Sequence, residues 1–517
     1  MTNKKQKLEL TWIGKDEELK LEPRILIEDP SKSYGDKSSE NMLIHGDNLL
    51  ALKALEQDFA GKIKCIYIDP PYNTGNAFEH YDDGVEHSIW LNLMKPRLEI
   101  LRNLLAKDGV IFITVDDKEG HYMKVLCDEV FSRRNFIQTI CWKSRDSISN
   151  DLLISPNHNF IFLYAKDQPT LFNSRKSFRL EKDYNGFENP DNDPNGPWKL
   201  SPVDGPGGAK KGNPFYEFQG ISGYWRYSLE TMQGLFDKGE IIKRGRSLAR
   251  KYYLSKAIEG GGKTATTWWD DCGTATEAKK EIIKLFPDDI FDTPKPERLI
   301  QRVVELGSQP GDWVLDSFLG SGTTSAVAHK NGRKHIGIEF GEHANTHCLS
   351  RLKKVVDGND GLKLSEELDW KGGGGFKFYN LASSLLRKDS FGNFVIDENY
   401  NANMLAAAMC KHEGFKFYPD ETLYWKHGKS TETDFIFVTT GFITTEQLDK
   451  VHSEMKAGES LLICAKAYAP ECENHFANIT IKKIPQMILG RCEFGKDNYD
   501  LNIIKATEAE AEESNEE

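Results

Sequence analysis

The sequence predicts an α/β fold built around a doubly wound, mostly parallel sheet. Short apolar runs alternate with segments of helical spacing from residue 42 to residue 166, and again from 293 to 355. Runs such as Ile66-Tyr67-Ile68 are apolar throughout, which is typical of a strand buried on both faces. Alternation of strands and helices produces a parallel sheet covered by helices.

The first region is expected to supply the start of this sheet. Residues 1–40 are polar and are expected to be irregular. The elements that follow are a strand, turn and helix at 42–55, a strand at 62–68, a helix at 87–107, a strand at 109–117 with a helix to about 131, and strands at 136–143 and 158–166.

The pattern breaks between residues 167 and 265, where Gly, Pro, Asn and aromatic residues are frequent. An irregular insert of this length in an enzyme is usually functional or disordered, and its interleaved aromatic and basic residues favour function. Order returns with a helix at 293–307, strand-turn-helix units at 312–332 and 334–355, an apparent boundary at 371–381, and a mixed segment at 385–505 that has strand-like runs at 435–440 and 460–468.

The composition is ordinary for a soluble chain. With 517 residues, of which 39% are hydrophobic and 28% charged, the chain can form about two to four domains. No apolar stretch approaches the roughly 18 residues of a membrane span, and no apolar signal core is present at the start. Nine scattered cysteines without a C-x-x-C pair indicate neither a metal site nor a disulfide framework. We therefore expect a cytoplasmic protein without membrane contact.

Charge is distributed unevenly along the chain. The net charge is −12, and the final segment 506–517 has six Glu and no basic residue, which predicts a disordered acidic tail. Residues 175–263 contain 16 Lys and Arg against 11 Asp and Glu. A net positive segment in an acidic protein is either chance variation or a surface that faces phosphate.

The stretch CIYIDPPYNTG ends an apolar run abruptly with Asp69, Pro70, Pro71 and Tyr72. Two prolines cannot continue a hydrogen-bonded ladder, so a plain strand followed by a turn is one interpretation. The other is a ligand site, because ligands bind at the carboxyl ends of parallel strands. A carboxylate, stiffened carbonyls and a flat ring suit a planar ligand that carries an amino group, such as a nucleobase.

A second stretch, VLDSFLGSGTT, is expected to be a strand, a glycine turn and a helix start. Gly320 and Gly322 allow the backbone to approach a ligand, and the helix N–H groups near Thr323 favour an anion. It is neither a Walker loop nor G-x-G-x-x-G. One strand later Glu339 ends the run IGIEFG, at a position where acids commonly bind ribose hydroxyls. Together these residues predict a cofactor that contains adenosine and ends in a carboxylate.

Taken together, the D-P-P-Y and F-L-G-S-G-T-T motifs resemble those of the S-adenosylmethionine-dependent DNA amino-methyltransferases. D-P-P-Y comes first and the glycine motif last, with the insert between them, which resembles the circularly permuted beta class. The neighbouring DPPYNTGN, TPKPERLI and GSGTT are most similar to modification (Mod) subunits of type III restriction systems and their solitary relatives. The resemblance covers roughly residues 40–380 and implies a Rossmann-like methyltransferase sheet.

The resemblance implies a role for each matching residue. Asp69 and the Pro70 carbonyl would accept the two hydrogens of the target amine, beside Pro71, and Tyr72 would stack on the flipped base. S-Adenosylmethionine would be bound by Asp47 at its adenine amine, Lys295 at its carboxylate, Asp316 near its amino-acid end, Glu339 at its ribose, and Phe318, Gly320, Gly322 and Thr323 along the glycine motif. No metal is implied.

The same resemblance divides the chain and assigns partners. The expected segments are a polar start at 1–40, a catalytic half at 41–145, a target-recognition insert at 146–270, a cofactor-binding half at 271–380, a C-terminal α/β extension of unknown role at 385–505 and the tail at 506–517. The insert would contact double-stranded DNA through Trp225, Arg226, Lys243, Arg244 and Arg246. A homodimer and a helicase-nuclease restriction subunit are the expected protein partners.

Several functions remain open at this point. D-P-P-Y favours adenine N6 as the methyl acceptor over cytosine N4, for which S-P-P-Y is commoner in the family. A non-catalytic DNA-recognition subunit of a restriction complex is an alternative, which the intact motifs argue against. Methylation of RNA or of a protein amide is another, and it is disfavoured because enzymes that act on glutamine usually show N-P-P-Y.

Overall fold

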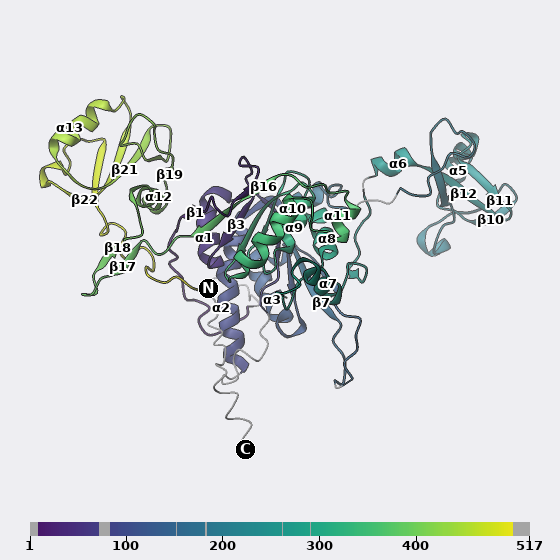
Figure 1. The fold of residues 1–517 in the computed structure, drawn as a ribbon. Helices are drawn as coiled ribbons and strands as arrows, with labels where there is room; N and C mark the ends of the chain where they lie inside the picture. The colour runs from purple at the N-terminus through teal and green to yellow at the C-terminus, as the bar shows by residue number, and fades with distance from the viewer. Residues whose placement is uncertain are drawn as a thin grey trace, which may run out of the picture. The chain divides into compact units, whose positions relative to one another are not determined.

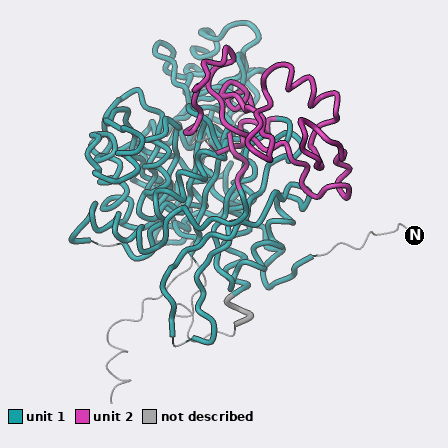
Figure 2. Tube along the Cα trace, turned by 90° about the vertical axis from the view of Figure 1, so that its right-hand side faces the viewer, with its two compact units in different colours: residues 1–173, 266–517 teal, residues 174–265 magenta. Residues whose placement is uncertain are grey.

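The computed structural model describes residues 9–71, 83–150, 152–180, 184–260, 262–289 and 291–499. These residues form two compact units, shown in different colours in Figure 2. Unit 1 comprises residues 1–173 and 266–517, and unit 2 comprises residues 174–265. The compact insert is therefore narrower than the predicted 146–270, because the residues that flank it at both ends belong to unit 1.

An 11-stranded sheet organises the described part of unit 1 (Figure 1). Its strands lie in the order β1-β16-β3-β15-β14-β4-β5-β7-β6-β13, and β2 pairs with β16 off this path. Their bounds are β1 Leu26–Glu28, β2 Tyr34–Gly35, β3 Met42–His45, β4 Ile63–Ile68, β5 Leu105–Val115, β6 Phe136–Lys143, β7 His158–Ala165, β13 Trp268–Trp269, β14 Trp313–Asp316, β15 Lys334–Glu339 and β16 Gly375–Leu381.

The centre of this sheet is parallel, which confirms the predicted fold class. Neighbouring strands run parallel from β16 through β3, β15, β14 and β4 to β5. β7 is antiparallel to both β5 and β6, and β1 is antiparallel to β16. Strands β14 and β15, from the second half of the chain, lie between β3 and β4 from the first half. The two sequence motifs therefore follow adjacent strands.

Helices cover both faces of the sheet, and the side chains of β3 show why. Met42 and Ile44 belong to the core beneath the first group of helices, whereas Leu43 between them packs with Cys348 and Leu352 on the other face. Successive strand side chains point to opposite faces, so a strand covered twice must be apolar at every position. The helices of unit 1 around this sheet are α1 Asn48–Phe59, α2 Asp83–Leu104, α3 Asp117–Phe131, α4 Gln168–Asn173, α7 Ala275–Leu285, α8 Glu297–Gly307, α9 Thr323–Lys330, α10 Leu349–Val356 and α11 Lys363–Glu367.

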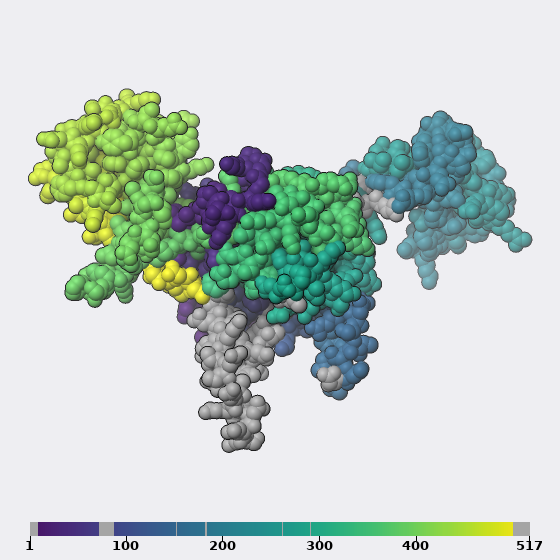
Figure 3. All heavy atoms as spheres, viewed as in Figure 1, coloured from purple at the N-terminus to yellow at the C-terminus, as the bar shows by residue number. Residues whose placement is uncertain are grey.

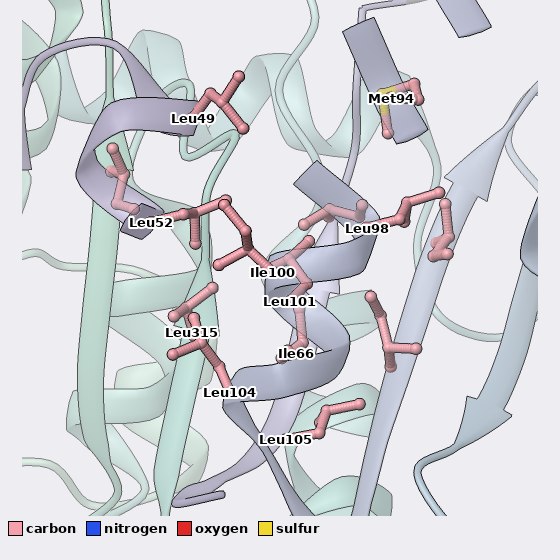
Figure 4. Close-up of a cluster of buried hydrophobic side chains, with 14 of the residues drawn as sticks. Leu49, Leu52, Ile66, Met94, Leu98, Ile100, Leu101, Leu104, Leu105 and Leu315 are labelled. Carbon is pink, nitrogen blue, oxygen red and sulfur yellow. The ribbon is translucent and has the colours of Figure 1, made fainter. Parts of the chain in front are cut away.

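The largest core lies between the sheet and helices α1, α2 and α3. Leu49 and Leu52 of α1, Leu98 and Leu101 of α2 and Ile66 of β4 belong to this core, and Figure 4 labels all five. All five side chains are completely buried. Burial of a leucine or isoleucine contributes about 1.5–3 kcal/mol, so this core holds the two helices that flank the end of β4 in a fixed position.

Two sequence predictions about the sheet are wrong. Residues 1–40 were expected to be irregular, yet β1 pairs with β16 and Arg24 is buried. Residues 371–381 were expected to be a boundary, yet β16 is an inner strand beside β3. The preceding run of glycines obscured the alternating pattern of this strand, in which Phe376 and Phe378 are buried. Gly375 is required there, since a Cβ would lie 2.4 Å from the backbone nitrogen of Asp36.

Unit 2 contains two small antiparallel sheets around its own core. Strand β12 pairs with both β11 and β8, and β9 pairs with β10. The core consists of apolar side chains between residues 203 and 248, among them Val203, Phe218 and Trp225. The elements are β8 Trp198–Pro202, β9 Phe215–Phe218, β10 Ile221–Tyr224, α5 Leu229–Asp237, β11 Ile241–Arg244, β12 Ser247–Tyr253 and α6 Leu254–Glu259.

The C-terminal part of unit 1 has a second sheet with the order β19-β20-β21-β22-β23. β21, β22 and β23 run parallel, which fits the α/β extension expected after residue 385. Ile25 from the start of the chain packs into its core. The elements are β17 Leu386–Lys388, β18 Phe394–Ile396, α12 Ala402–Glu413, β19 Lys416–Phe417, β20 Gly428–Lys429, β21 Asp434–Ile443, α13 Thr445–Glu454, β22 Ser460–Tyr468 and β23 Ile479–Lys483.

Among the described residues, no helix combines the length and apolar character needed to cross a membrane. The same residues contain no group of three or more His, Cys, Asp or Glu side chains placed to hold a metal ion.

Candidate active site

A cavity of about 270 Å³ lies at the carboxyl ends of β4, β14 and β15. This is the edge at which open α/β sheets bind ligands. The residues from both sequence motifs meet here, although more than 200 residues separate them along the chain. The lining residues are Asn48, Tyr67, Asp69, Pro71, Phe291, Thr293, Pro294, Lys295, Asp316, Ser317, Phe318, Leu319, Gly320, Ser321, Thr323, Thr324, Glu339, Phe340 and His343.

Asp69 directly follows β4 and presents a partly buried carboxylate to the cavity. Its Oδ2 accepts a hydrogen bond from the Lys295 ammonium group, with which it forms an ion pair. Pro70 is buried, and the Pro71 carbonyl accepts a 2.8 Å hydrogen bond from Trp90 Nε1 on α2. The carboxylate is therefore held on a stiff, anchored turn. Tyr72 lies outside the described residues.

Asp316 ends β14 and organises the glycine loop from inside. Its Oδ1 accepts a 2.9 Å hydrogen bond from the Phe318 backbone N–H, and its Oδ2 accepts a 2.6 Å bond from the Thr324 hydroxyl. The carboxyl group thereby connects the start of the loop to the first turn of α9. Thr323, at the first position of this helix, lines the cavity.

Gly320 and Gly322 both have left-handed backbone conformations, with φ of +56° and +83°. Other residues adopt such conformations only with strain. A Cβ on Gly322 would also lie 3.2 Å from the Cα of Cys348, so the loop packs directly against the π-helix Ala344–Cys348. Gly322 supports the loop from behind and does not line the cavity, whereas Gly320 does.

Glu339 lies at the end of β15 and binds the same loop. Its Oε2 accepts a 2.7 Å hydrogen bond from the Gly320 backbone N–H, and its Oε1 accepts a 3.0 Å bond from the Gly341 N–H. Glu339 also lines the cavity. The side chain can therefore fix the loop and still offer acceptor positions to a hydroxyl group of a ligand.

The electrostatics of the cavity centre on Asp316. Complete burial raises the pKa of its carboxyl group to about 7, while the hydrogen bonds from Thr324 and Phe318 lower it and the charges of Asp69 and Glu339 raise it further. A ligand that carries positive charge would favour the ionised form and lower this pKa again. The arrangement is suited to a cationic group.

This raised pKa predicts how stability depends on pH. Between its ordinary value of 3.8 and about 7, folded Asp316 retains a proton that the unfolded chain releases, so rising pH favours unfolding. A shift of about three units corresponds to up to about 4 kcal/mol. We expect the melting temperature without cofactor to fall from pH 5 to pH 8, and Asp316→Asn to flatten that fall. Parallel melting curves for the two proteins would contradict the prediction.

Asn48 is a cavity residue that sequence reasoning missed. Its Nδ2 donates a 2.7 Å hydrogen bond to the Ser317 carbonyl, and its Oδ1 accepts one of 2.5 Å from Arg97 Nε. Arg97 is buried on α2. The pair ties α1, α2 and the glycine loop together. The available signal was the motif G-D-N itself, in which the residue after Asp47 begins a helix at the ligand-binding edge.

Asp47 does not contribute to the cavity, contrary to its predicted contact with an adenine amine. The carboxylate is buried, where its Oδ1 accepts the N-capping hydrogen bond from Leu50 N–H and its Oδ2 accepts a bond from Tyr499 N–H. Helix capping by Asp is common. An aspartate at a turn can either bind a ligand or cap a helix. Here the carboxylate caps α1 and binds the C-terminal segment.

A buried charge network behind the glycine loop was also missed. Arg351 Nη1 donates a hydrogen bond of 2.8 Å to the Thr323 hydroxyl, and its Nη2 donates one of 2.9 Å to Glu297 Oε1. Glu297 Oε2 accepts a 2.6 Å bond from Lys330, which also pairs with Asp360 at 3.0 Å. All four charged residues are at least nine-tenths buried. Nothing in the local sequence distinguished these from solvated surface charges.

The predicted DNA contacts in unit 2 divide into two groups. Arg226, Lys243, Arg244 and Arg246 are exposed; Arg244 ends β11, and Arg246 lies in the two-residue turn that leads to β12. Trp225, in contrast, is buried in the core of the unit, where its Nε1 donates a hydrogen bond of 2.9 Å to the Tyr216 carbonyl. The prediction of a DNA contact for Trp225 is therefore wrong. Its neighbours Tyr224 and Arg226 are the exposed residues in this stretch.

Comparison with known proteins places these observations in a family. The profile of the DNA methylase family matches residues 63–347, which include both motifs. The probable type III restriction-modification enzyme HindVI Mod subunit of Haemophilus influenzae is 33% identical over 412 residues, which cover 66% of this chain and 54% of that protein. The StyLTI Mod subunit of Salmonella typhimurium is 32% identical over 338 residues, which cover 56% of this chain and 50% of that protein.

Among solved structures, the PvuII DNA methyltransferase (cytosine-N4-specific) is 12% identical and has a TM-score of 0.34, with coverage of 64% of this chain and 91% of that one. The fold assignment therefore rests on the sheet described above. The chain spans about half the length of the two curated relatives. Because the family profile matches more than half of the chain, and its match contains the strands and loops that form the cavity, this chain belongs to the DNA methylase family.

Proposed function

We propose that the chain is a DNA methyltransferase that transfers a methyl group from S-adenosylmethionine to the exocyclic N6 of an adenine flipped out of double-stranded DNA, in the cytoplasm. One observation carries the proposal. Asp69, after β4, and the glycine loop with Glu339, after β14 and β15, line one cavity. An acceptor for an amine and a cradle for a cofactor thus lie within reach of each other.

The residues around Asp69 account for activation of the amine. The lone pair of an exocyclic amine is delocalised into the ring, which makes the nitrogen a poor nucleophile. Hydrogen bonds from the amine to Asp69 and to the Pro70 carbonyl would favour tetrahedral nitrogen and direct its lone pair. Orientation of this kind can contribute roughly 7–11 kcal/mol. After transfer, the carboxylate of Asp69 would accept the proton that the amine loses.

The cavity also fits the cofactor. S-Adenosylmethionine supplies the methyl group as part of a sulfonium cation. Asp316 would face the cationic amino-acid end, Glu339 would accept from ribose hydroxyls, and Lys295 would approach the carboxylate. Gly320 allows the backbone to come close, and Phe318 and Thr323 complete the wall. Asn48 also lines this wall.

Lys295 connects the two halves of the site. Its ammonium group pairs with Asp69 in the structure, yet the family resemblance assigns it to the carboxylate of the cofactor. Both positions would be reached by the same flexible side chain. We infer that cofactor binding draws Lys295 away from Asp69 and so exposes the carboxylate to the target amine.

Recognition of DNA is assigned to unit 2. Its exposed Arg226, Lys243, Arg244 and Arg246 would contact phosphates and base edges. The named relatives are Mod subunits of type III restriction-modification enzymes, and on that basis we propose a homodimer that associates with a helicase-nuclease restriction subunit. The acid of D-P-P-Y supports adenine as the target base over cytosine.

The proposal is tested by methyl transfer from labelled S-adenosylmethionine to unmethylated bacterial DNA, followed by digestion and separation of the nucleosides. RNA and a protein extract are assayed alongside. We expect label in N6-methyladenosine from DNA only. Label in N4-methylcytosine would change the target base and keep the mechanism. Absence of transfer to DNA, from protein that binds the cofactor by calorimetry, would overturn the assignment.

A further inference from the structure

A loop between β6 and β7 extends from the edge of the sheet that carries the cavity. β7 is antiparallel to β5, so His158 at its start lies level with the carboxyl end of β5, and Lys143 pairs with His158. The base of the loop is ordered, because the backbone N–H groups of Ser144 and Arg145 both donate to the Asn157 carbonyl. Figure 1 shows this segment projecting below and to the right of the β7 label, and Figure 3 shows it in blue.

Four exposed aliphatic residues lie near the far end of this loop, among the polar residues Ser147, Ser149 and Asn150. Leu153 is fully exposed, Ile154 is 86% exposed, Ile148 is 77% exposed and Leu152 is more than half exposed. Single exposed apolar residues are normal, but four of them on one projecting loop mark an interaction surface. These four residues are called the apolar tip below.

The base of the loop lies at a distance from β4 that is comparable with the width of a DNA groove. Asp69 follows β4, and β5, β7 and β6 are the next strands along the sheet. At about 4.8 Å per strand, the base of the loop lies about 10–15 Å from β4. The major groove of DNA is about 12 Å wide. A duplex that delivers a base to Asp69 would therefore pass in front of the loop.

We propose that the apolar tip enters the DNA duplex beside the target base and occupies the space that the flipped base leaves. This inference rests on the proposed function. It adds a second surface for contact with DNA, which lies in unit 1 and not in unit 2. Unstacking a base costs a few kcal/mol. Aliphatic side chains inserted at a base step offset that cost, as in other proteins that unstack DNA.

The position and shape of the loop favour DNA over a second copy of the chain as its occupant. The loop lies on the edge to which the target base must come, and its exposed aliphatic residues are confined to the part near its far end. The residues at its base are polar or charged, including Arg145 and the ion pair of Lys143 with Asp146. A narrow apolar tip on a polar stem suits insertion between stacked bases, whereas a stable protein interface buries a broad patch of about 800 Å² on each partner.

The test uses the full chain and the recognition site mapped by the transfer assay. A duplex with that site has 2-aminopurine at the target adenine, whose fluorescence rises when the base unstacks. A second duplex lacks the target base. The variant is Leu153→Ser combined with Ile154→Ser, and the control is Phe391→Ser, which alters a residue that is 87% exposed in the turn between β17 and β18.

We expect the double variant to melt like the wild type, since both side chains are exposed. It should bind the 2-aminopurine duplex about 10–100-fold more weakly and give a smaller fluorescence rise. On the duplex without the target base, which needs no unstacking, its affinity should return to within about threefold of wild type. The Phe391→Ser control should match the wild type on both duplexes.

Three results would overturn the inference. Equal weakening on both duplexes would mean that the tip only contacts DNA, and unchanged binding would exclude contact. Loss of self-association in sedimentation, with normal unstacking, would assign the tip to a second copy of the chain. In each case wild-type transfer to DNA persists, so the proposed function stands. If the wild type methylates no DNA, both the proposed function and this inference fail.

Discussion

Replacing Asp69 by asparagine is expected to lower the rate of methyl transfer by about 10²–10³-fold while the chain still binds S-adenosylmethionine. The loss is of the size seen when one preorganised group is removed from a catalytic site. Asparagine retains one acceptor oxygen but adds an amide donor, which would face the hydrogens of the target amine. It also removes the negative charge that would balance positive charge on the amine nitrogen.

Cofactor affinity distinguishes this explanation from a general loss of structure. Asp69 pairs with Lys295 in the cavity, so Asp69→Asn releases the lysine and should leave the affinity equal or higher. Single-turnover transfer and calorimetric binding measure the two quantities separately. Asp116→Asn is the matched control, because Asp116 directly follows the neighbouring strand β5 but caps α3, a role that asparagine also fills. Parallel loss of binding and transfer in Asp69→Asn would contradict an acceptor role.

The second large effect is expected in the charge network behind the glycine loop. Arg351→Met should destabilise unit 1 by about 3–5 kcal/mol, the usual cost of removing one partner from a buried ion pair. Glu297 would retain the ion pair with Lys330 alone, and the Thr323 hydroxyl would lose the hydrogen bond from Arg351. Because Thr323 lines the cavity, the affinity for S-adenosylmethionine should fall as well.

Urea unfolding and calorimetry test this prediction. Arg298→Met makes the same substitution in an ion pair with Glu367, in which both side chains are more than 40% exposed. Exposed pairs contribute about 0–1 kcal/mol, so this control should unfold near the wild-type midpoint. If both variants lower the free energy of unfolding by the same amount, the contribution of Arg351 to stability does not depend on its burial.

The sequence was sufficient to predict the residues that are adjacent in the chain and chemically distinctive. Strand-helix alternation predicted the parallel sheet, and D-P-P-Y and the glycine motif marked the ends of β4 and β14. Residues whose role depends on distant partners were not predictable in this way. Arg351 and Lys330 resemble solvated charges until α8, α9 and α10 come together around Glu297.

The errors have a common physical cause, which is that local composition does not determine burial. Trp225 lies between exposed residues in a segment with basic character, yet it is the one that faces the core of unit 2. Gly375 ends a glycine run, yet the strand that it begins needs that glycine to fit beside Asp36. Asp47 and Asn48 are neighbours at one turn, and only their packing decides which of the two reaches the cavity.

The strand order has a consequence for synthesis on the ribosome. Strands β3 and β4 emerge early, but β14 and β15, which separate them in the sheet, follow only after residue 312. At about 5–20 residues per second, the nascent chain waits on the order of ten to fifty seconds for its central strands. During that interval the apolar edges of β3 and β4 have no native neighbour between them, while unit 2 emerges with a core of its own. Production of the chain in cells should therefore depend on chaperones that bind nascent polypeptides, and a fragment that ends before β14 should aggregate.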